Sequence, residues 1–313
     1  MTLSLSQLDQ LREFERQLDP QKPERSKIPA RVLGYGEIST VFEIETAGLR
    51  GLALKRLPSF VNQIEIEKYT ATFVEYNRLL EQDIGLQLPA RDYAIVTNAK
   101  GRPVFYIVQQ KLPAESIGNR AIHHLSHEQV QSLVRRVLRH ARQVWDFNRR
   151  QNRIQVAIDG QISNWSIDGE SLRYVDTSTP LFRIDGIEQL DTELFLRSAP
   201  SFMVWILRAF FLKDVVNRYY DFHRVAVDLV ANFYKEQKPE LIPDVIQTAN
   251  EFFAGEAQEL NIAPLTAKEV NAYYKEDALI WSLYFNMRKV DRFLRLRVLR
   301  GEYPYILPEQ IKR

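Results

Sequence analysis

Apolar residues follow two different periods in the first third of the chain. They recur every three to four positions over 5–18 and over 63–82, which predicts an amphipathic helix in each range. Elsewhere in this third, apolar and polar residues alternate, as is typical of strands with one buried face. The strand-like runs are 32–46, 52–54, 93–96 and 104–108. The pattern therefore predicts antiparallel strands arranged around one helix.

After Pro113 the pattern becomes mainly helical. A long amphipathic helix is expected over 126–150, and a short strand-rich segment over 154–174 interrupts the helices. Further helices are expected at 188–197, 201–212, 214–236, 240–254, 266–276 and 277–300. We therefore predict an α+β protein with two lobes. A small lobe over 1–112 contains the N-terminal helix and the sheet, and a larger, mainly helical lobe spans 113–313.

The composition is that of a globular protein and excludes several classes of function. The 313 residues are 45% hydrophobic and 26% charged, with no apolar run of about 18 residues, so neither a membrane-spanning helix nor a membrane partner is expected. Cysteine is absent, which excludes disulfides, thiolate catalysis and cysteine-based zinc sites. The first residues have no basic stretch followed by a long apolar core, so no secretory signal is expected. Together these features predict a cytoplasmic protein.

The net charge of +2 is too small to argue for a nucleic-acid partner. Basic residues are concentrated locally in 135–153 and 288–300. We interpret both clusters as solvated helix faces with carboxylate partners. The alternative is a basic surface for an anionic partner that includes Arg288, Arg292, Arg295 and Arg300.

Gly34 and Gly36 stand between two strand-like runs. Glycine there lets the backbone approach phosphate oxygens and point N–H groups at them, although an ordinary hairpin turn has the same pattern. Lys55 ends the next apolar strand, where its ammonium group would lie under the phosphates or else be a surface charge. A lysine held inside the protein needs a carboxylate partner. Glu75 on the following helix is the first candidate for that partner, and Glu67 is the second.

Two loop segments carry candidate acidic chemistry. Asp159 and Asn164 are five residues apart, so one loop can present both side chains to one cavity, and Asp176 follows a strand-like run. Mg²⁺ bound to a triphosphate prefers hard oxygen ligands, which Asn164 and Asp176 would supply. Asp159 would accept a hydrogen bond from a substrate hydroxyl and act as a base or orienting group. Each residue also has a simpler interpretation, as part of an Asp-Gly turn, a turn residue or a strand cap.

The order and spacing of these residues resemble the protein-kinase-like superfamily, and most of all its small-molecule branch, the aminoglycoside phosphotransferase and choline kinase group. The resemblance covers 30–180 by motif order and the remainder only by layout. It implies a bilobal kinase-like fold that uses ATP and Mg²⁺, with Asp159 as the catalytic residue and Asn164 and Asp176 as metal ligands. The positions that it implies for the nucleotide are Gly34, Gly36, Ser39 in place of a third glycine, Lys55, Glu75, and the linker residues Gln110 and Leu112.

Two positions depart from the pattern of that family. Ala157 stands two residues before Asp159, where the family usually has a histidine that supports the loop. Asp176 is followed by Thr-Ser-Thr-Pro at 177–180 rather than by Phe-Gly, and no Ala-Pro-Glu motif is recognisable, which argues against a protein kinase. The sequence therefore predicts an ATP- and Mg²⁺-dependent phosphotransferase that acts on a hydroxyl of a small-molecule acceptor. The alternative is a kinase-fold pseudoenzyme that binds nucleotide or a partner without transferring phosphate.

Overall fold

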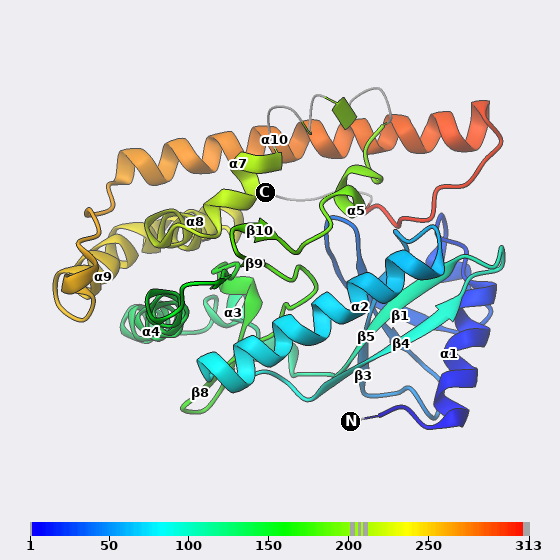
Figure 1. The fold of residues 1–313 in the computed structure, drawn as a ribbon, viewed down its shortest axis with the longest axis horizontal. Helices are drawn as coiled ribbons and strands as arrows, with labels where there is room; N and C mark the ends of the chain where they lie inside the picture. Colours follow the sequence, from blue (N-terminus) through cyan, green and yellow to red (C-terminus); the bar gives the residue numbers. More distant parts are fainter. Residues whose placement is uncertain (1, 201–203, 206–207, 209–211, 309–313) are drawn as a thin grey trace.

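A five-stranded antiparallel sheet and a group of helices make up the two parts of the molecule (Figure 1). The computed structural model describes residues 2–200, 204–205, 208 and 212–308. The strand order in the sheet is β1-β2-β3-β5-β4. The strands are β1 (Ala30–Tyr35), β2 (Thr40–Ile44), β3 (Leu52–Leu57), β4 (Arg91–Thr97) and β5 (Pro103–Gln110). The predicted α+β class and antiparallel sheet are confirmed.

Helices cover both faces of this sheet, so β5 is buried along most of its length. On one face, Phe14 packs against Phe42 with ring centroids 5.4 Å apart. On the other face, Phe73 lies 5.5 Å from Phe105. Each such ring contributes about 1.5–3 kcal/mol through burial, which holds the helices in place. The two covering helices are α1 (Leu5–Gln17) and α2 (Gln63–Arg78).

The helical part is built around α4 (His127–Arg150), whose apolar side faces the core. Trp145 of α4 stacks on Phe222 with ring centroids 4.6 Å apart. The other helices are α3 (Gly118–Ala121), α5 (Glu193–Leu196), α7 (Leu212–Arg218), α8 (Phe222–Lys235), α9 (Ile242–Ala254) and α10 (Ala267–Phe293). Short strands between them are β6 (Ile154–Val156), β7 (Trp165–Asp168), β8 (Ser171–Tyr174), β9 (Phe182–Ile184) and β10 (Ile187–Glu188). In the part of the chain that the structure describes, no helix combines the length and apolar character needed to cross a bilayer.

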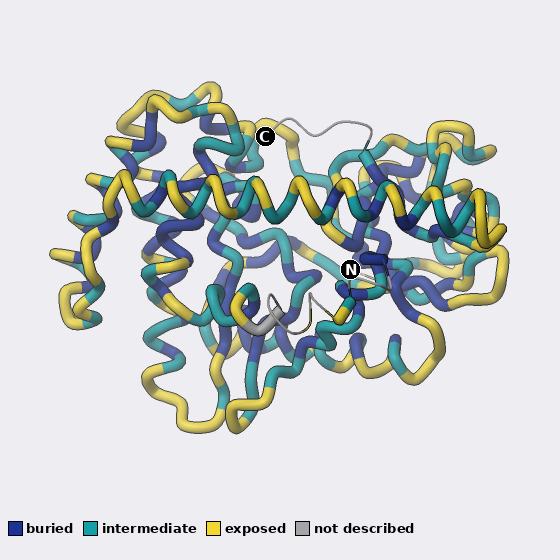
Figure 2. Tube along the Cα trace, turned by 90° about the horizontal axis from the view of Figure 1, so that it is seen from above, coloured by how far each residue is buried: buried dark blue, intermediate teal, exposed yellow. Residues whose placement is uncertain are grey.

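α10 connects the helical part to the sheet. Its 27 residues make it about 40 Å long, and Figures 1 and 2 show it lying across the outside of the molecule. Val270 near its start is buried in the core of the helical part, whereas Phe285 near its end packs into the core of the sheet. The segment that follows returns onto the sheet, where Tyr303 and Tyr305 are buried. Residues 303–307 thus pack with the sheet, whereas the predicted lobe boundary groups them with the helices.

Several predicted helix boundaries were wrong. The helices expected at 266–276 and 277–300 form the single helix α10, because no glycine or proline separates them. The helix expected at 214–236 divides into α7 and α8. Over 188–197 the chain forms β10 and the short α5 instead of one helix. The helix expected at 201–212 falls mostly outside the described residues.

Candidate functional site

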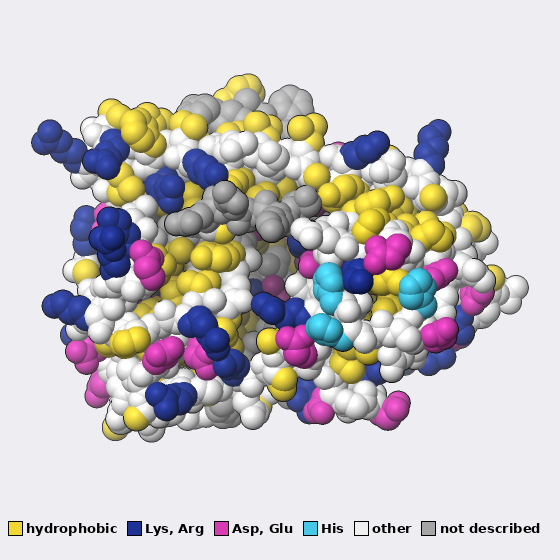
Figure 3. Space-filling model, turned by 180° about the vertical axis from the view of Figure 1, so that it is seen from behind, with side chains coloured by type: hydrophobic (Ala, Val, Ile, Leu, Met, Phe, Trp, Pro, Cys, Tyr) yellow, Lys and Arg dark blue, Asp and Glu magenta, His cyan; other side chains and the backbone are white. Residues whose placement is uncertain are grey.

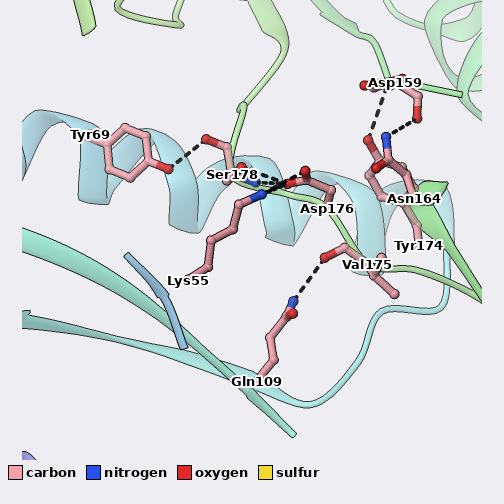
Figure 4. A network of polar contacts seen from close by, with 9 residues as sticks. All are labelled: Lys55, Tyr69, Gln109, Asp159, Asn164, Tyr174, Val175, Asp176 and Ser178. Atoms are coloured by element: carbon pink, nitrogen blue, oxygen red, sulfur yellow. Dashed lines mark hydrogen bonds and ion pairs between the residues drawn. The ribbon is translucent and has the colours of Figure 1, made fainter. Parts of the chain in front are cut away.

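Two pairs of polar residues lie side by side where the sheet meets the helical part (Figure 4). Lys55 extends from β3 and donates to both carboxylate oxygens of Asp176, at 2.7 Å to Oδ1 and 2.8 Å to Oδ2. Asn164 donates from Nδ2 to the backbone carbonyl of Asp159 at 3.2 Å. The carboxyl groups of Asp159 and Asp176 interact electrostatically. The fold therefore brings Lys55 of the sheet to three residues of 159–176, from which at least 100 residues separate it in the sequence.

The backbone after β8 holds Asp176 in place. Ser178 donates to Oδ1 of Asp176 from its backbone N at 3.0 Å and from its hydroxyl at 2.7 Å. Val175 donates its N–H to the carbonyl of Asn164 at 2.8 Å, which links this segment to the loop of Asp159. Burial acts to raise the pKa of Asp176, but the Lys55 charge and the hydrogen bonds from Lys55 and Ser178 hold that pKa below its ordinary value. Asp176 is therefore ionised at neutral pH.

Asp159 lies in the loop after β6, and hydroxyl groups fix that loop. The N–H of Asp159 donates to the Tyr174 hydroxyl at 3.2 Å, and its Oδ1 accepts from the N–H of Gln161 at 3.1 Å. Tyr76 of α2 donates its hydroxyl to the carbonyl of Ala157 at 2.8 Å. Where the resemblance led us to expect a histidine, a tyrosine from α2 therefore supports the loop.

The surroundings of Asp159 place its titration close to neutral pH. Burial raises the pKa of Asp159 to about 6, and the negative charge of Asp176 adds to the increase. Hydrogen bonds from the Gln161 N–H and from Asn164, and the positive charge of Lys235, oppose it. A carboxyl group with such a pKa can both accept and release a proton near neutral pH, as a general base must.

The turn between β1 and β2 lies next to Lys55, because Val41 of β2 pairs with Lys55 in the sheet. Gly36 donates its N–H to the carbonyl of Ser39 at 2.9 Å. A Cβ atom on Gly36 would lie 2.4 Å from the Ser39 hydroxyl, so any side chain there would force Ser39 to move. Gly34 has open space around it. Of the two glycines, only Gly36 lies where a Cβ atom would displace a neighbouring group, the Ser39 hydroxyl.

The expected ion pair between Lys55 and Glu75 is not formed. Glu75 accepts two hydrogen bonds from Arg78, at 2.9 and 2.8 Å, and Glu67 accepts from Gln63 on the exposed side of α2. α2 turns its aromatic residues toward the protein interior, and the glutamates lie on other sides of the helix. This prediction was wrong, and Asp176 is the carboxylate that neutralises Lys55.

At the end of β5, two backbone N–H groups of the predicted adenine-binding linker are already hydrogen-bonded within the protein. The N–H groups of Gln110 and Lys111 already donate to carbonyl groups of the protein, at 3.3 and 2.9 Å. The side chain of Gln109 points toward the site and donates to the carbonyl of Val175 at 3.1 Å (Figure 4). Adenine contacts at Gln110 and Leu112 stay a prediction, and the Gln110 N–H is not available for them without rearrangement.

Next to Asp159 lies a chain of polar contacts that the sequence analysis missed. Gln161 donates from Nε2 to Oδ2 of Asp228 at 3.3 Å, and its Oε1 accepts from Lys235 Nζ at 3.1 Å. Asp228 is only 8% exposed. Its burial raises the pKa of Asp228 to about 7, with the negative charges of Asp159 and Asp277 adding to the increase and Lys235 opposing it.

A sequence signal for Asp228 did exist. It is the one charged residue in the otherwise uncharged run 225–234, which forms the buried side of α8. A lone acidic residue in a buried helix is rare without a functional or structural partner. The loop of Asp159 packs closely on this helix, since a Cβ atom on Gly160 would lie 2.7 Å from Val225 Cγ1.

A surface cavity of about 450 Å³ lies away from Lys55 and Asp176, over α3. Its lining residues are Glu115, Asn119, Arg120, His123, His124 and Glu236. Acidic and basic side chains there pair with one another, as in the contact of His124 with Glu115 at 3.1 Å. None of its lining residues belongs to the two polar pairs.

Carboxylates surround the basic residues of 135–153. Figure 3 shows acidic and basic side chains interspersed over one face of the molecule. Arg135, Arg139 and Arg142 of α4 pair with glutamates of α9 and of the loop after it, at 2.9, 2.5 and 2.6 Å. In the second cluster, Arg288 is only 5% exposed and Arg295 pairs with Asp291. Arg288 is therefore not part of an accessible basic surface.

Comparison with known proteins identifies the family of this chain but no activity. No curated protein matches the chain. One family, described as a family of unknown function (DUF6206), matches residues 14–292. The match includes the sheet, the loops of Asp159 and Asp176, and nearly all of α10. The chain therefore belongs to the DUF6206 family.

Proposed function

We propose that this protein is an ATP- and Mg²⁺-dependent phosphotransferase that phosphorylates a hydroxyl group of a small molecule. The observation that carries the proposal is the meeting of Lys55 and Asp176 beside Asp159 and Asn164. Phosphoryl transfer depends mainly on positioning and on charge neutralisation. These residues would supply a cation, a hard-oxygen ligand and a base at one place.

The arrangement of the chain supports a kinase-like fold with two lobes. A helix stands between the third and fourth strands of a five-stranded antiparallel sheet and packs on that sheet. The chain then continues into a mainly helical part, as the resemblance implies. Lys55 comes from the sheet, whereas the three other residues come from loops between helices and short strands of the helical part.

The donor atoms fit a magnesium ion that keeps most of its water ligands. Among the described residues, no group of three or more His, Asp or Glu side chains could hold a metal ion. Mg²⁺ bound to phosphates needs only one or two protein oxygens. The Asp176 side chain is 35% exposed and ionised, so its carboxylate could bind the ion together with the Asn164 side-chain oxygen. The ion would neutralise phosphate charge there.

Lys55 and Asp176 neutralise each other. Lys55 is 16% exposed, and an unpaired charge at that depth would be unfavourable. In the proposed complex Lys55 contacts phosphate oxygens, and Asp176 keeps an opposite charge nearby. The ion pair therefore holds both groups at one place, where they would meet the nucleotide.

Asp159 would accept the proton of the acceptor hydroxyl. Its pKa of about 6 leaves the carboxylate mostly ionised at neutral pH and still basic enough to take the proton. Asp228 and Gln161 would line the acceptor side of this residue. The buried Asp228 favours an acceptor that carries a basic group, because a cation would offset the unfavourable ionisation of this carboxyl group.

A pseudoenzyme that binds nucleotide or a partner without transfer is the second candidate. Two observations favour it: Lys55 lacks the expected glutamate partner, and two linker N–H groups are already engaged. Nucleotide binding without turnover would support this candidate, whereas ATP hydrolysis lost in Asp159→Asn would exclude it.

Thermal unfolding with and without MgATP tests nucleotide binding, the first step of the proposed reaction. A ligand at 100 times its Kd adds about 2.7 kcal/mol of stability, which raises the melting temperature measurably. We expect this increase in the wild type and in the control Asp168→Asn, an exposed turn residue paired with Arg173. Asp176→Asn should show little increase relative to its own ligand-free value. No increase in the wild type would refute nucleotide binding.

Phosphate transfer to a library of hydroxyl compounds would then test the reaction.

A further inference from the structure

Arg288 connects the far end of the chain to the turn that contains Gly36. It lies near the end of α10 and is only 5% exposed. Its guanidinium group donates from Nη1 to the backbone carbonyl of Glu37, and from Nε to the Tyr303 hydroxyl at 3.1 Å. Glu37 follows Gly36 directly, so this contact is made to the turn between β1 and β2 itself.

A guanidinium group this deeply buried requires compensation for the water it has lost. The Glu37 carbonyl and the Tyr303 hydroxyl supply hydrogen-bond acceptors. The faces of two further rings supply negative charge density, because the guanidinium carbon lies 5.5 Å from the centroid of Tyr284 and 5.3 Å from that of Tyr305. Arg288 thus donates to the Tyr303 hydroxyl from one side of its guanidinium group and to the Glu37 carbonyl from another.

This contact fixes the orientation of one peptide unit in the turn. A peptide is planar, so a carbonyl held by Arg288 also sets the direction of the N–H that follows it, that of Ile38. The turn is closed by the contact of the Gly36 N–H with the Ser39 carbonyl at 2.9 Å. The donor and the acceptor of that closing contact lie on either side of the Glu37–Ile38 unit.

The helix that contains Arg288 also contacts the helical part of the molecule. At its other end, Tyr274 stacks on Tyr234 of α8 with ring centroids 4.8 Å apart. α8 also holds Asp228 and Lys235, which reach Gln161 in the loop of Asp159. α10 therefore contacts the turn on the sheet directly and the loop of Asp159 through α8.

We propose that Arg288 is a positioning residue that holds the β1–β2 turn in the geometry needed to cover the nucleotide phosphates. The contact with the turn stands on its own, whereas its consequence for nucleotide rests on the proposed phosphotransferase function. Arg288 contacts no reacting atom in this account. It acts through the backbone of Glu37 and Ile38.

Amide hydrogen exchange on Arg288→Gln and the control Arg292→Gln tests the contact without any ligand. Arg292 lies one turn further along α10 and is partly exposed. Losing a hydrogen bond from a charged donor should speed exchange over 34–40 by about tenfold in Arg288→Gln. Exchange over 127–150 should stay unchanged in both variants. Unchanged exchange over 34–40, or an equal increase in α4, would overturn the proposal.

A steady-state measurement separates positioning from general weakening of the fold. In Arg288→Gln we expect the KM for MgATP to rise about tenfold while kcat changes by less than about threefold. A fall in kcat alone would contradict a role at the phosphates. If the wild type binds no nucleotide, the proposed function fails, and hydrogen exchange still decides whether Arg288 holds the turn.

Tyr303→Phe provides a second variant in case Arg288→Gln does not fold. It removes the hydroxyl that accepts from Arg288 Nε and leaves the ring in place. Exchange over 34–40 should then increase in the same direction but less. No change in this variant, together with an unfolded Arg288→Gln, would reduce Arg288 to a structural residue and overturn the proposal.

Discussion

Lys55 and Asp176 form a two-point ion pair although 121 residues separate them in the chain. The lysine comes from the sheet, and the aspartate follows a short strand of the helical part. The pair is partly shielded from water, so the attraction between its charges is stronger than on an open surface. It joins the two parts of the molecule at the point where we place the phosphates.

Replacing the lysine tests this relationship. Lys55→Met should lower ATP-dependent turnover by at least about 100-fold, because removing one preorganised charge at a reacting phosphate typically has this effect. Titration calorimetry should show weaker MgATP binding as well. Lys68→Met, at an exposed position on α2, is the matched control and should behave as the wild type. Equal activity in the two variants would contradict the role of Lys55.

The pKa of Asp159 predicts how activity depends on pH. A base must be ionised to accept a proton, so kcat/KM should rise about tenfold per pH unit below pH 6 and level off above it, in line with the pKa of about 6. The pKa of Asp176 is lowered, so this residue should stay ionised through the same range. Rates across pH 4.5–8 would check the profile. A profile that is flat through pH 6 would exclude Asp159 as the base.

Asp228 predicts a pH-dependent gain in stability on substitution. Its pKa rises from 3.8 unfolded to about 7 folded, so the folded protein binds more protons between these values and loses stability as pH rises through them. Asp228→Asn should therefore be more stable than the wild type at pH 8, by roughly 1–4 kcal/mol, and the difference should disappear near pH 4. Urea unfolding at both pH values measures it. A difference of the same size at pH 8 and at pH 4 would contradict this role of the Asp228 carboxyl group.

Tyr76 predicts a coupled loss of stability and activity. Tyr76→Phe removes the hydroxyl that donates to the Ala157 carbonyl, and this leaves a buried acceptor unsatisfied. We expect a loss of about 1–3 kcal/mol in unfolding free energy and a lower kcat, since the Asp159 loop loses an anchor. Tyr93→Phe, at a position 38% exposed, is the control. A variant with full activity would show that the loop does not need this support.

The two glycines of the β1–β2 turn should respond differently to alanine. Gly36→Ala places a Cβ atom where the Ser39 hydroxyl lies, whereas Gly34→Ala enters open space. We expect MgATP affinity to fall about tenfold in the first variant and to change little in the second. The tenfold loss corresponds to the free-energy cost of one strained contact. Gly36→Ala combined with Ser39→Ala should recover much of the loss, because the clash is removed. Failure of this rescue would mean that Gly36 matters for another reason.

Local patterns were sufficient for much of the fold and for part of the candidate site. The alternation around Val41 and the run before Lys55 predicted neighbouring strands, and the structure has them paired. Asp159 was selected for its five-residue spacing to Asn164, and Asp176 because it follows a strand-like run. These features depend on residues close together in the chain, and periodicity reports such features well.

The partners of these residues were decided only by the tertiary structure. Glu75 was a reasonable partner for Lys55, but the rotation of α2 that buries Tyr69 and Tyr76 turns Glu75 away from the sheet. Asp176 takes its place because the segment after β8 comes within hydrogen-bond distance of Lys55 on β3. Which side of a helix faces inward, and which loop it meets, depends on the packing of the whole core rather than on local spacing.

The amino-acid order by itself thus determined the succession of strands and helices and the acidic loop residues along the chain, but not where each helix begins and ends. It did not determine that Asp228 would lie beside Asp159, or that Arg288 would reach the turn at Glu37 across 251 positions. Those contacts arise when α8 and α10 pack across the molecule. Contacts between distant segments leave no periodic signal in one sequence, because either partner alone has the pattern of an ordinary helix.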